Sequence, residues 1–333
     1  GTAEVGSYRS LYTTASQMGR LNYSYDSRYL FSFTVRRDGS SVFGKDNKWG
    51  TFPSVALGWN IANEKFMKPN QNWLNTLKLR LSYGKSGNEA ISSYQTLSKM
   101  ESAAIAMGGQ TATALFPNSL MGNSKLSWET TKTFNIGFDF GLLNNRINGN
   151  LDFYKSTTTD LLLKRNLPRV SGFENVFANM GKTANTGIEF TVNSKNIVTR
   201  SFTWGSSLVF SWNKNEIKNL YGDGKDDIGN RWFIGHPIGI VYDYIVDGIW
   251  QEDEIASGAH KNVDPIAKAG DLKLRDIDGD HQITDKDRVV RGQTSPKWIG
   301  GLTNTFTYKN LTLNVFLTSS LRHPKCPNGQ KEA

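Results

Sequence analysis

The feature that most constrains this chain is a strict alternation of apolar and polar side chains. From residue 77 to residue 83 every odd position is apolar or aromatic, and every even position is polar. Further along, Ile136, Phe138 and Phe140 alternate with Gly137 and Asp139. Successive side chains of a strand point to opposite faces, so this pattern predicts strands with one greasy and one polar face. No comparable helical period occurs in the sequence.

The alternation predicts about ten strands, each about 10–14 residues long. Strands of globular proteins usually have about 5–6 residues, whereas a tilted strand that crosses a membrane needs about 9–11. The predicted lengths therefore favour membrane-crossing strands. The strands are expected near residues 13–25, 28–37, 49–60, 73–84, 128–141, 146–157, 184–193, 201–212, 296–308 and 311–320.

The connections between these strands alternate between short and long. Those at 26–27, 61–72, 142–145, 194–200 and 309–310 are short or modest, and those at 38–48, 85–127, 158–184 and 213–295 are longer. Every second connection lies on the same side of an up-and-down sheet. Short turns at one end and long loops at the other are typical of outer-membrane barrels, whereas a soluble sandwich has no reason to keep this parity.

Composition excludes several classes of protein. No window approaches the roughly 18 uncharged apolar residues of a membrane-spanning helix. The 9 Trp, 12 Tyr and 18 Phe argue against disorder. The net charge is +9, but Lys and Arg are scattered singly, so we expect no nucleic-acid partner. The one cysteine, Cys326, excludes a disulfide framework, and a chain that opens with Gly1 is interpreted as a fragment.

The apolar face of such a sheet needs a cover, and the sequence offers no second layer of helices to supply one. Lipid can cover it instead. Tyr and Trp side chains near the predicted strand ends fit an interfacial aromatic girdle, although aromatic residues also favour strands in general. The fold class expected from these observations is all-β, an antiparallel up-and-down transmembrane β-barrel, of which this chain supplies about ten strands.

Several stretches carry a family resemblance beyond periodicity. They are Arg37–Ser41 with Phe43-Gly44 and Trp49-Gly50, Phe52–Ser54 with Gly58-Trp59, Leu77–Arg80 with Ser82–Gly84, Leu126–Thr130, Asn145–Ile147, Thr159–Leu162, Asn179–Gly181 and Asn185–Glu189. In this order they resemble the SusC/RagA family of TonB-linked outer-membrane proteins, over roughly residues 12–320. The tail 321–333 loses the alternation and does not resemble the family, which suggests truncation or a frameshift.

The resemblance implies a large barrel in the outer membrane, plugged by an N-terminal domain, that imports a bulky nutrient such as an oligosaccharide or a peptide. It also implies a SusD-like surface lipoprotein as a lid, and TonB as the energy source. The plug and the TonB box would precede this chain, which would form the C-terminal part of the barrel in residues 1–320. The alternative is a non-transport surface receptor, or a soluble β-rich glycan-binding module.

A twelve-residue acidic motif lies in the longest predicted loop, at residues 276–287. Oxygen ligands at positions 1, 3, 5, 7, 9 and 12 of such a loop can wrap around a hard cation such as Ca²⁺. Two departures weaken the match, because position 6 is His281 instead of Gly and position 12 is Asp instead of Glu. The alternative is a plain Asp- and Gly-rich surface turn. The candidate ligands are Asp276, Asp278, Asp280, Gln282, Thr284 and Asp287.

No catalytic constellation appears in the sequence. None of the four His has a second His or a Cys at zinc spacing, and no serine elbow or phosphate-binding glycine loop occurs. We therefore expect no enzyme. Aromatic residues such as Trp232, Tyr244 and Trp250 in the long loop would either stack on cargo or fold the loop onto itself. Charges on the polar strand faces should point into the barrel, because a charge on the lipid face costs about 2–4 kcal/mol at the midplane. These charged residues are Arg80, Glu129, Asp139, Asp152 and Glu189.

Overall fold

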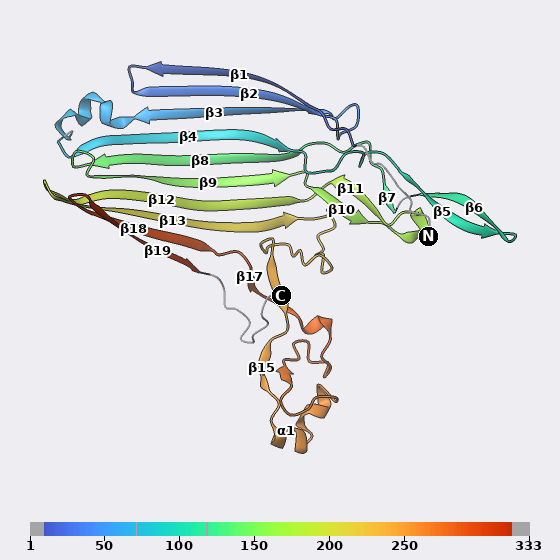
Figure 1. Ribbon diagram of the computed structural model, residues 1–333. Helices are drawn as coiled ribbons and strands as arrows, with labels where there is room; N and C mark the ends of the chain where they lie inside the picture. The colour runs from blue at the N-terminus through green and yellow to red at the C-terminus, as the bar shows by residue number, and fades with distance from the viewer. Residues whose placement is uncertain (1–9, 71, 118, 322–333) are drawn as a thin grey trace.

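A computed structural model describes residues 10–70, 72–117 and 119–321. Its main element is one ten-stranded antiparallel sheet in which each strand pairs with the next long strand along the chain (Figure 1). This is the predicted up-and-down arrangement, and every predicted strand is present in the predicted order. The strands are β1 (Thr14–Tyr25), β2 (Tyr29–Ser40), β3 (Trp49–Asn60), β4 (Leu74–Asn88), β8 (Glu129–Leu142), β9 (Ile147–Thr159), β12 (Lys182–Val198), β13 (Phe202–Asn219), β18 (Trp298–Tyr308) and β19 (Leu311–Leu321).

The predicted parity of the connections is also present. The short turns lie together at one end of the sheet, and the folded loops extend from the other, hereafter the long-loop end (Figure 1). Residues 26–28 join β1 to β2, and Asp26 and Ser27 have φ of 50° and 53°, the left-handed conformation that suits a tight hairpin connection. At the same end, η1 (Ile61–Asn63) and η2 (Lys65–Asn70) connect β3 to β4.

One face of the sheet is apolar across consecutive strands. Leu79 pairs with Phe138, Phe138 with Leu151, Leu151 with Phe190, and Phe190 with Phe210, and all of these side chains share that face. Phe138 is 37% exposed, and in the described chain no second layer covers this outer face. The apolar outer face is therefore not buried in a dry protein interior, and this exposure is what the membrane interpretation requires.

The described chain contains no helix long and apolar enough to span a membrane.

The long connections contain strands that the sequence did not reveal. A hairpin of two strands projects from the β4–β8 connection, and further short strands pair in three small sheets at the long-loop end (Figure 1). These elements are β5 (Met100–Met107), β6 (Gln110–Pro117), β7 (Leu120–Met121), β10 (Leu162–Asn166), η3 (Arg169–Ser171), β11 (Asn175–Asn179), β14 (Ile240–Asp243), β15 (Val246–Ile249), α1 (Glu252–Ala256), η4 (Ala259–Asn262), β16 (Leu272–Leu274), η5 (Asp285–Asp287) and β17 (Val289–Gln293).

Several strands run further than the alternation predicts. β13 continues through 213–219, so the longest connection begins at residue 220 and not at 213, and β12 extends in both directions. β19 includes Leu321, which pairs with Trp298. The remainder of the predicted non-family tail, with Cys326, lies outside the described residues.

The best-buried apolar cluster lies at the long-loop end instead of behind the sheet. Val42, Phe43 and Leu126 are at most 1% exposed and form one cluster. The ring centroid of Trp128 lies 5.2 Å from that of Phe43, so the loop after β2 packs on the segment before β8. This cluster holds the end of β2 against the start of β8, from which the long connections extend.

Candidate functional site

The inner face of the sheet, opposite the apolar outer face, carries a charged cluster near mid-height. The guanidinium of Arg80 on β4 lies between two carboxylates, with Nη2 2.9 Å from Asp139 Oδ1 and 2.9 Å from Asp152 Oδ2. The Asn150 amide donates a further hydrogen bond to Asp152 at 2.9 Å. Gly137 makes room for the cluster, because a Cβ there would collide with Asp152 and Arg80. Three adjacent strands thus place their charges on one polar wall.

The remaining predicted wall charges lie on the same face. Glu189 on β12 lies directly opposite Asp152 on β9 in the strand register. Glu129, at the start of β8, accepts hydrogen bonds from the Asn88 amide at 3.3 Å and from the Leu162 backbone N–H at 3.4 Å. The strand register thereby places every charge that was predicted to point inward on the inner face, opposite the apolar outer face.

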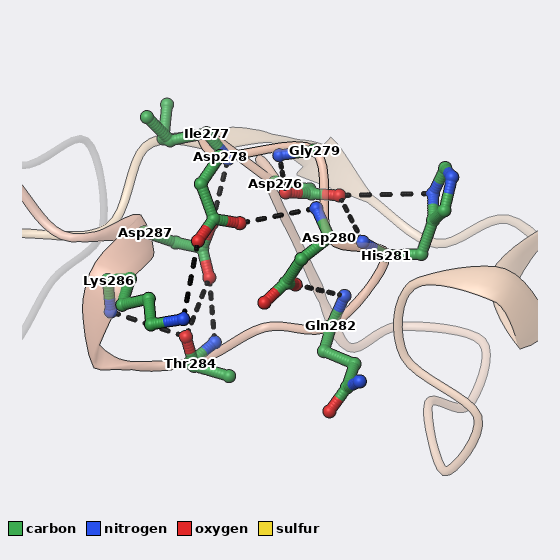
Figure 2. A network of polar contacts seen from close by, with 10 residues as sticks. All are labelled: Asp276, Ile277, Asp278, Gly279, Asp280, His281, Gln282, Thr284, Lys286 and Asp287. Carbon is green, nitrogen blue, oxygen red and sulfur yellow. Dashed lines mark hydrogen bonds and ion pairs between the residues drawn. The ribbon is translucent and has the colours of Figure 1, made fainter.

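The acidic motif 276–287 forms a tight loop between β16 and β17 (Figure 2). Asp276 accepts hydrogen bonds from the backbone N–H groups of Gly279 at 2.7 Å and His281 at 2.9 Å. Asp278 Oδ1 accepts from the Asp280 backbone at 3.2 Å. The short Asp side chains bond to backbone groups just ahead of them, which curls the chain around its own carboxylates.

His281 takes the turn that a glycine usually supplies at this position. Its φ is +63°, and that of Gly279 is +74°. Histidine occupies the left-handed region more often than most residues, so the departure from Gly does not prevent the loop from closing. The His281 side chain points away from the carboxylates' centre (Figure 2) and is exposed.

Asp287 is the most buried member of the motif, with 0% of its surface exposed. Its carboxylate accepts hydrogen bonds from the backbone N–H groups of Thr284 at 2.7 Å and Ile277 at 2.8 Å. These two bonds, the first the stronger influence, hold the pKa of Asp287 below its usual range. A buried, ionised carboxylate therefore joins the two ends of the loop.

Three of the six predicted ligands come together. Asp276, Asp278 and Asp287 each offer a carboxylate oxygen, and these oxygens all lie within 4.8 Å of one another. Oxygens that share one Ca²⁺ at about 2.4 Å cannot be more than about 4.8 Å apart, so this cluster could hold a metal ion. Asp280 is not part of this carboxylate cluster in the described chain, and its Oδ1 instead accepts a hydrogen bond from the backbone N–H of Gln282 at 2.9 Å.

Thr284 lies beside the cluster, with Oγ1 3.4 Å from Asp287 Oδ2, where it also caps η5 by accepting from Lys286 N. Two nitrogen-bearing side chains approach the carboxylates. Lys286 Nζ is 4.0 Å from Asp278 Oδ2, and His281 Nδ1 is 4.0 Å from Asp276 Oδ2. The Lys286 contact is at the limit of an ion pair, so it neutralises the acidic charge only weakly.

The aromatic residues of the long loop mostly fold that loop onto itself. Trp250 is 4% exposed, and its ring meets the buried His260 ring edge-on at 6.2 Å. Lys273 Nζ lies 4.5 Å from the Trp250 ring centroid and 2.6 Å from Glu254 Oε1. The sequence did not reveal this packing, because Glu254, His260 and Lys273 come from three separate short elements, α1, η4 and β16.

A long up-and-down antiparallel sheet with a bare apolar face and a charged opposite wall defines an outer-membrane barrel protein. Comparison with known proteins agrees. Residues 2–323 match the family described as TonB dependent receptor-like, beta-barrel, and the chain belongs to that family. It is accordingly an outer-membrane receptor segment and not an enzyme, as the sequence predicts.

The similar proteins include curated receptors of two bacteria. TonB-dependent receptor SusC of Bacteroides thetaiotaomicron is 37% identical over 96% of this chain and 32% of its own length. TonB-dependent receptor P3 of Formosa agariphila is also 37% identical, over 96% of this chain and 33% of its own. This chain therefore spans about a third of these relatives and resembles the SusC/RagA type predicted from its motifs.

A solved structure shows the same architecture. The RagAB peptide importer in its closed-closed state superposes with a TM-score of 0.76 at 28% identity, over 93% of this chain and 33% of that chain.

Proposed function

We propose that this chain forms part of a receptor that imports a large nutrient, an oligosaccharide or a peptide, across the outer membrane. The observation that carries this proposal is the pairing of a lipid-facing outer surface with the inner wall that holds Arg80, Asp139 and Asp152. A wall of that kind suits a wide hydrophilic passage. Likeness to a peptide importer supports the peptide class of cargo.

A SusD-like lipoprotein lid and TonB are the partners we infer for the complete receptor. The support for the lid is the likeness to the two-component RagAB importer together with the mass of folded loops at one end of the sheet. The TonB contact and the plug would belong to the two thirds of the relatives' length that this chain does not span.

Uptake by cells tests import. Deletion of the receptor gene should abolish growth on its nutrient, and deletion of tonB or of the neighbouring lipoprotein gene should have the same effect. A receptor that binds its nutrient while uptake continues without it would support a non-transport receptor instead. An intact protein that behaves as a monodisperse monomer without detergent would support the soluble glycan-binding alternative.

We also propose that the 276–287 loop binds Ca²⁺ in a structural role. One support is the set of three carboxylates whose oxygens lie within 4.8 Å of one another. The other is that backbone N–H groups from both ends of the loop, those of Ile277 and Thr284, donate hydrogen bonds to Asp287. Asp276, Asp278 and Asp287 would hold the ion directly. Asp280, Gln282 and Thr284 would complete the shell after small rearrangements, since Ca²⁺ takes 6–8 oxygen ligands.

Limited proteolysis tests this calcium proposal. Trypsin sites at Arg275, Lys286 and Arg288 flank or lie within the loop. We expect chelation to accelerate cleavage there, and Ca²⁺ but not Mg²⁺ to restore protection. Asp276→Asn should remove the calcium dependence. Asp285→Asn is the matched control, because it removes a carboxylate of the same loop that lies outside the cluster. Equal cleavage with and without chelator would exclude the site.

A further inference from the structure

A cavity of about 560 Å³ opens at the long-loop end of β1–β4. Phe52 and Trp128 form its aromatic wall, with ring centroids 5.5 Å apart. Phe52 is buried, and a Cβ on Gly87 would collide with its ring. The indole N–H of Trp128 donates to the Lys48 carbonyl at 3.1 Å. Packing and hydrogen bonding therefore hold this wall in place.

The other walls carry charges of both signs. Arg36 and Asp38 neutralise each other, with Nε 2.7 Å from Oδ1. Two further charged residues of the cavity, Glu89 and Lys85, have no oppositely charged partner among the described residues. Glu89 accepts a hydrogen bond from the Tyr12 hydroxyl with Oε1, while Oε2 is buried without a hydrogen-bond partner among the described residues.

Lys85 is the positive counterpart. Its Nζ lies 5.9 Å from the Phe52 ring centroid, and no carboxylate of the described chain lies within 4.0 Å of it. The cavity thus presents one cation and one anion that no described residue neutralises. A ligand that fills the cavity and excludes water must supply the opposite charges, because an unpaired charge is costly to bury.

We propose that this cavity is a cargo subsite for a zwitterionic peptide segment, with Glu89 accepting from an ammonium group and Lys85 pairing with a carboxylate. This inference rests on the proposed import function. A neutral oligosaccharide offers only hydroxyl groups and would leave both charges unpaired. A sulfated or uronic-acid oligosaccharide carries negative charge alone, so it could pair with Lys85 but would meet Glu89 as a like charge.

Retention on the intact receptor with its lipoprotein tests the assignment. The probes are a tryptic digest of casein, the same digest with its amino groups acetylated, and maltoheptaose. We expect wild-type receptor to retain the untreated digest, with about a tenfold loss on acetylation and a similar loss in Glu89→Gln or Lys85→Gln. The matched controls are Glu252→Gln and Lys261→Gln, which change surface charges of the long loop outside the cavity.

Each remaining outcome overturns a different statement. Equal peptide retention by Glu89→Gln, Lys85→Gln and wild type, or retention indifferent to acetylation, overturns the subsite. Retention of maltoheptaose without peptide overturns the peptide class but leaves import standing. A nutrient that binds yet enters the cell equally well without the receptor overturns the import function itself. The acetylation arm uses wild-type protein, so it remains decisive if a variant fails to fold.

Discussion

The ten-stranded sheet and the long loop at 220–297 differ in how far their apolar side chains are exposed. On the sheet, Phe138 is 37% and Leu313 58% exposed, and no described layer covers them. In the loop, Trp250 and His260 are 4% and 6% exposed, although this region has short strands, two short 3-10 helices and a five-residue α-helix. The sheet therefore depends on lipid for its stability, whereas the loop carries a small core of its own and should fold and unfold separately.

The largest effect is expected from Trp250→Ala. Removing the ring leaves a cavity beside His260 and abolishes the contact with Lys273, and truncation of a buried Trp costs about 3–5 kcal/mol. Hydrogen exchange should rise across 244–275 while β4 and β8 keep their protection. Trp250→Phe, which retains an aromatic ring, should show a smaller change. Faster exchange in the sheet as well would show that the two regions are not independent.

The complementary change is made in the sheet. Leu79→Arg on the outer face of β4 puts a charge toward hydrocarbon, at about 2–4 kcal/mol near the midplane. We expect less receptor in the outer membrane and loss of the heat-modifiable band on gels.

Ser82→Arg is the matched control, since it adds the same side chain three residues along the same strand but on the inner face. It should assemble normally. Similar assembly of both variants would contradict the assignment of the outer face to lipid.

The same contrast explains what the sequence could predict. The strands were recognised because lipid on one side and a polar wall on the other impose a period of two. The signal fades where β13 continues through Asn213 and Lys214, beyond the apolar stretch, and there the predicted end was too early. β5 is composed largely of Ala, Met and Ser, which gives no alternation to detect.

The candidate sites differ in the same respect. The acidic loop could be predicted because its residues lie in one continuous segment with a fixed spacing. The cavity could not, since its walls combine residues from Tyr12 to Trp128 that only the register of four strands brings together. The spacing suggests six ligands, of which the carboxylates of Asp276, Asp278 and Asp287 lie together in the described chain, and the six-ligand set stays a prediction.

The smallest effect is expected at the short-turn end, which is held by a polar network instead of an apolar core. Glu64 accepts hydrogen bonds from the Tyr29 hydroxyl at 2.6 Å, from the Trp59 indole at 3.0 Å and from Arg28 at 3.0 Å. These partners, the Tyr29 bond foremost, hold the pKa of Glu64 below its usual value.

Because the folded pKa of Glu64 is depressed, its stabilising contribution is present above the unfolded value of about 4.3 and is lost as the pH falls through the folded pKa. Hydrogen exchange across 58–68, corrected for the intrinsic rate, should therefore rise in acid. Glu64→Gln should show faster exchange at neutral pH and little further change in acid. A wild-type profile that stays flat through this range would mean that the network does not hold the turn, and that packing alone fixes this end of the sheet.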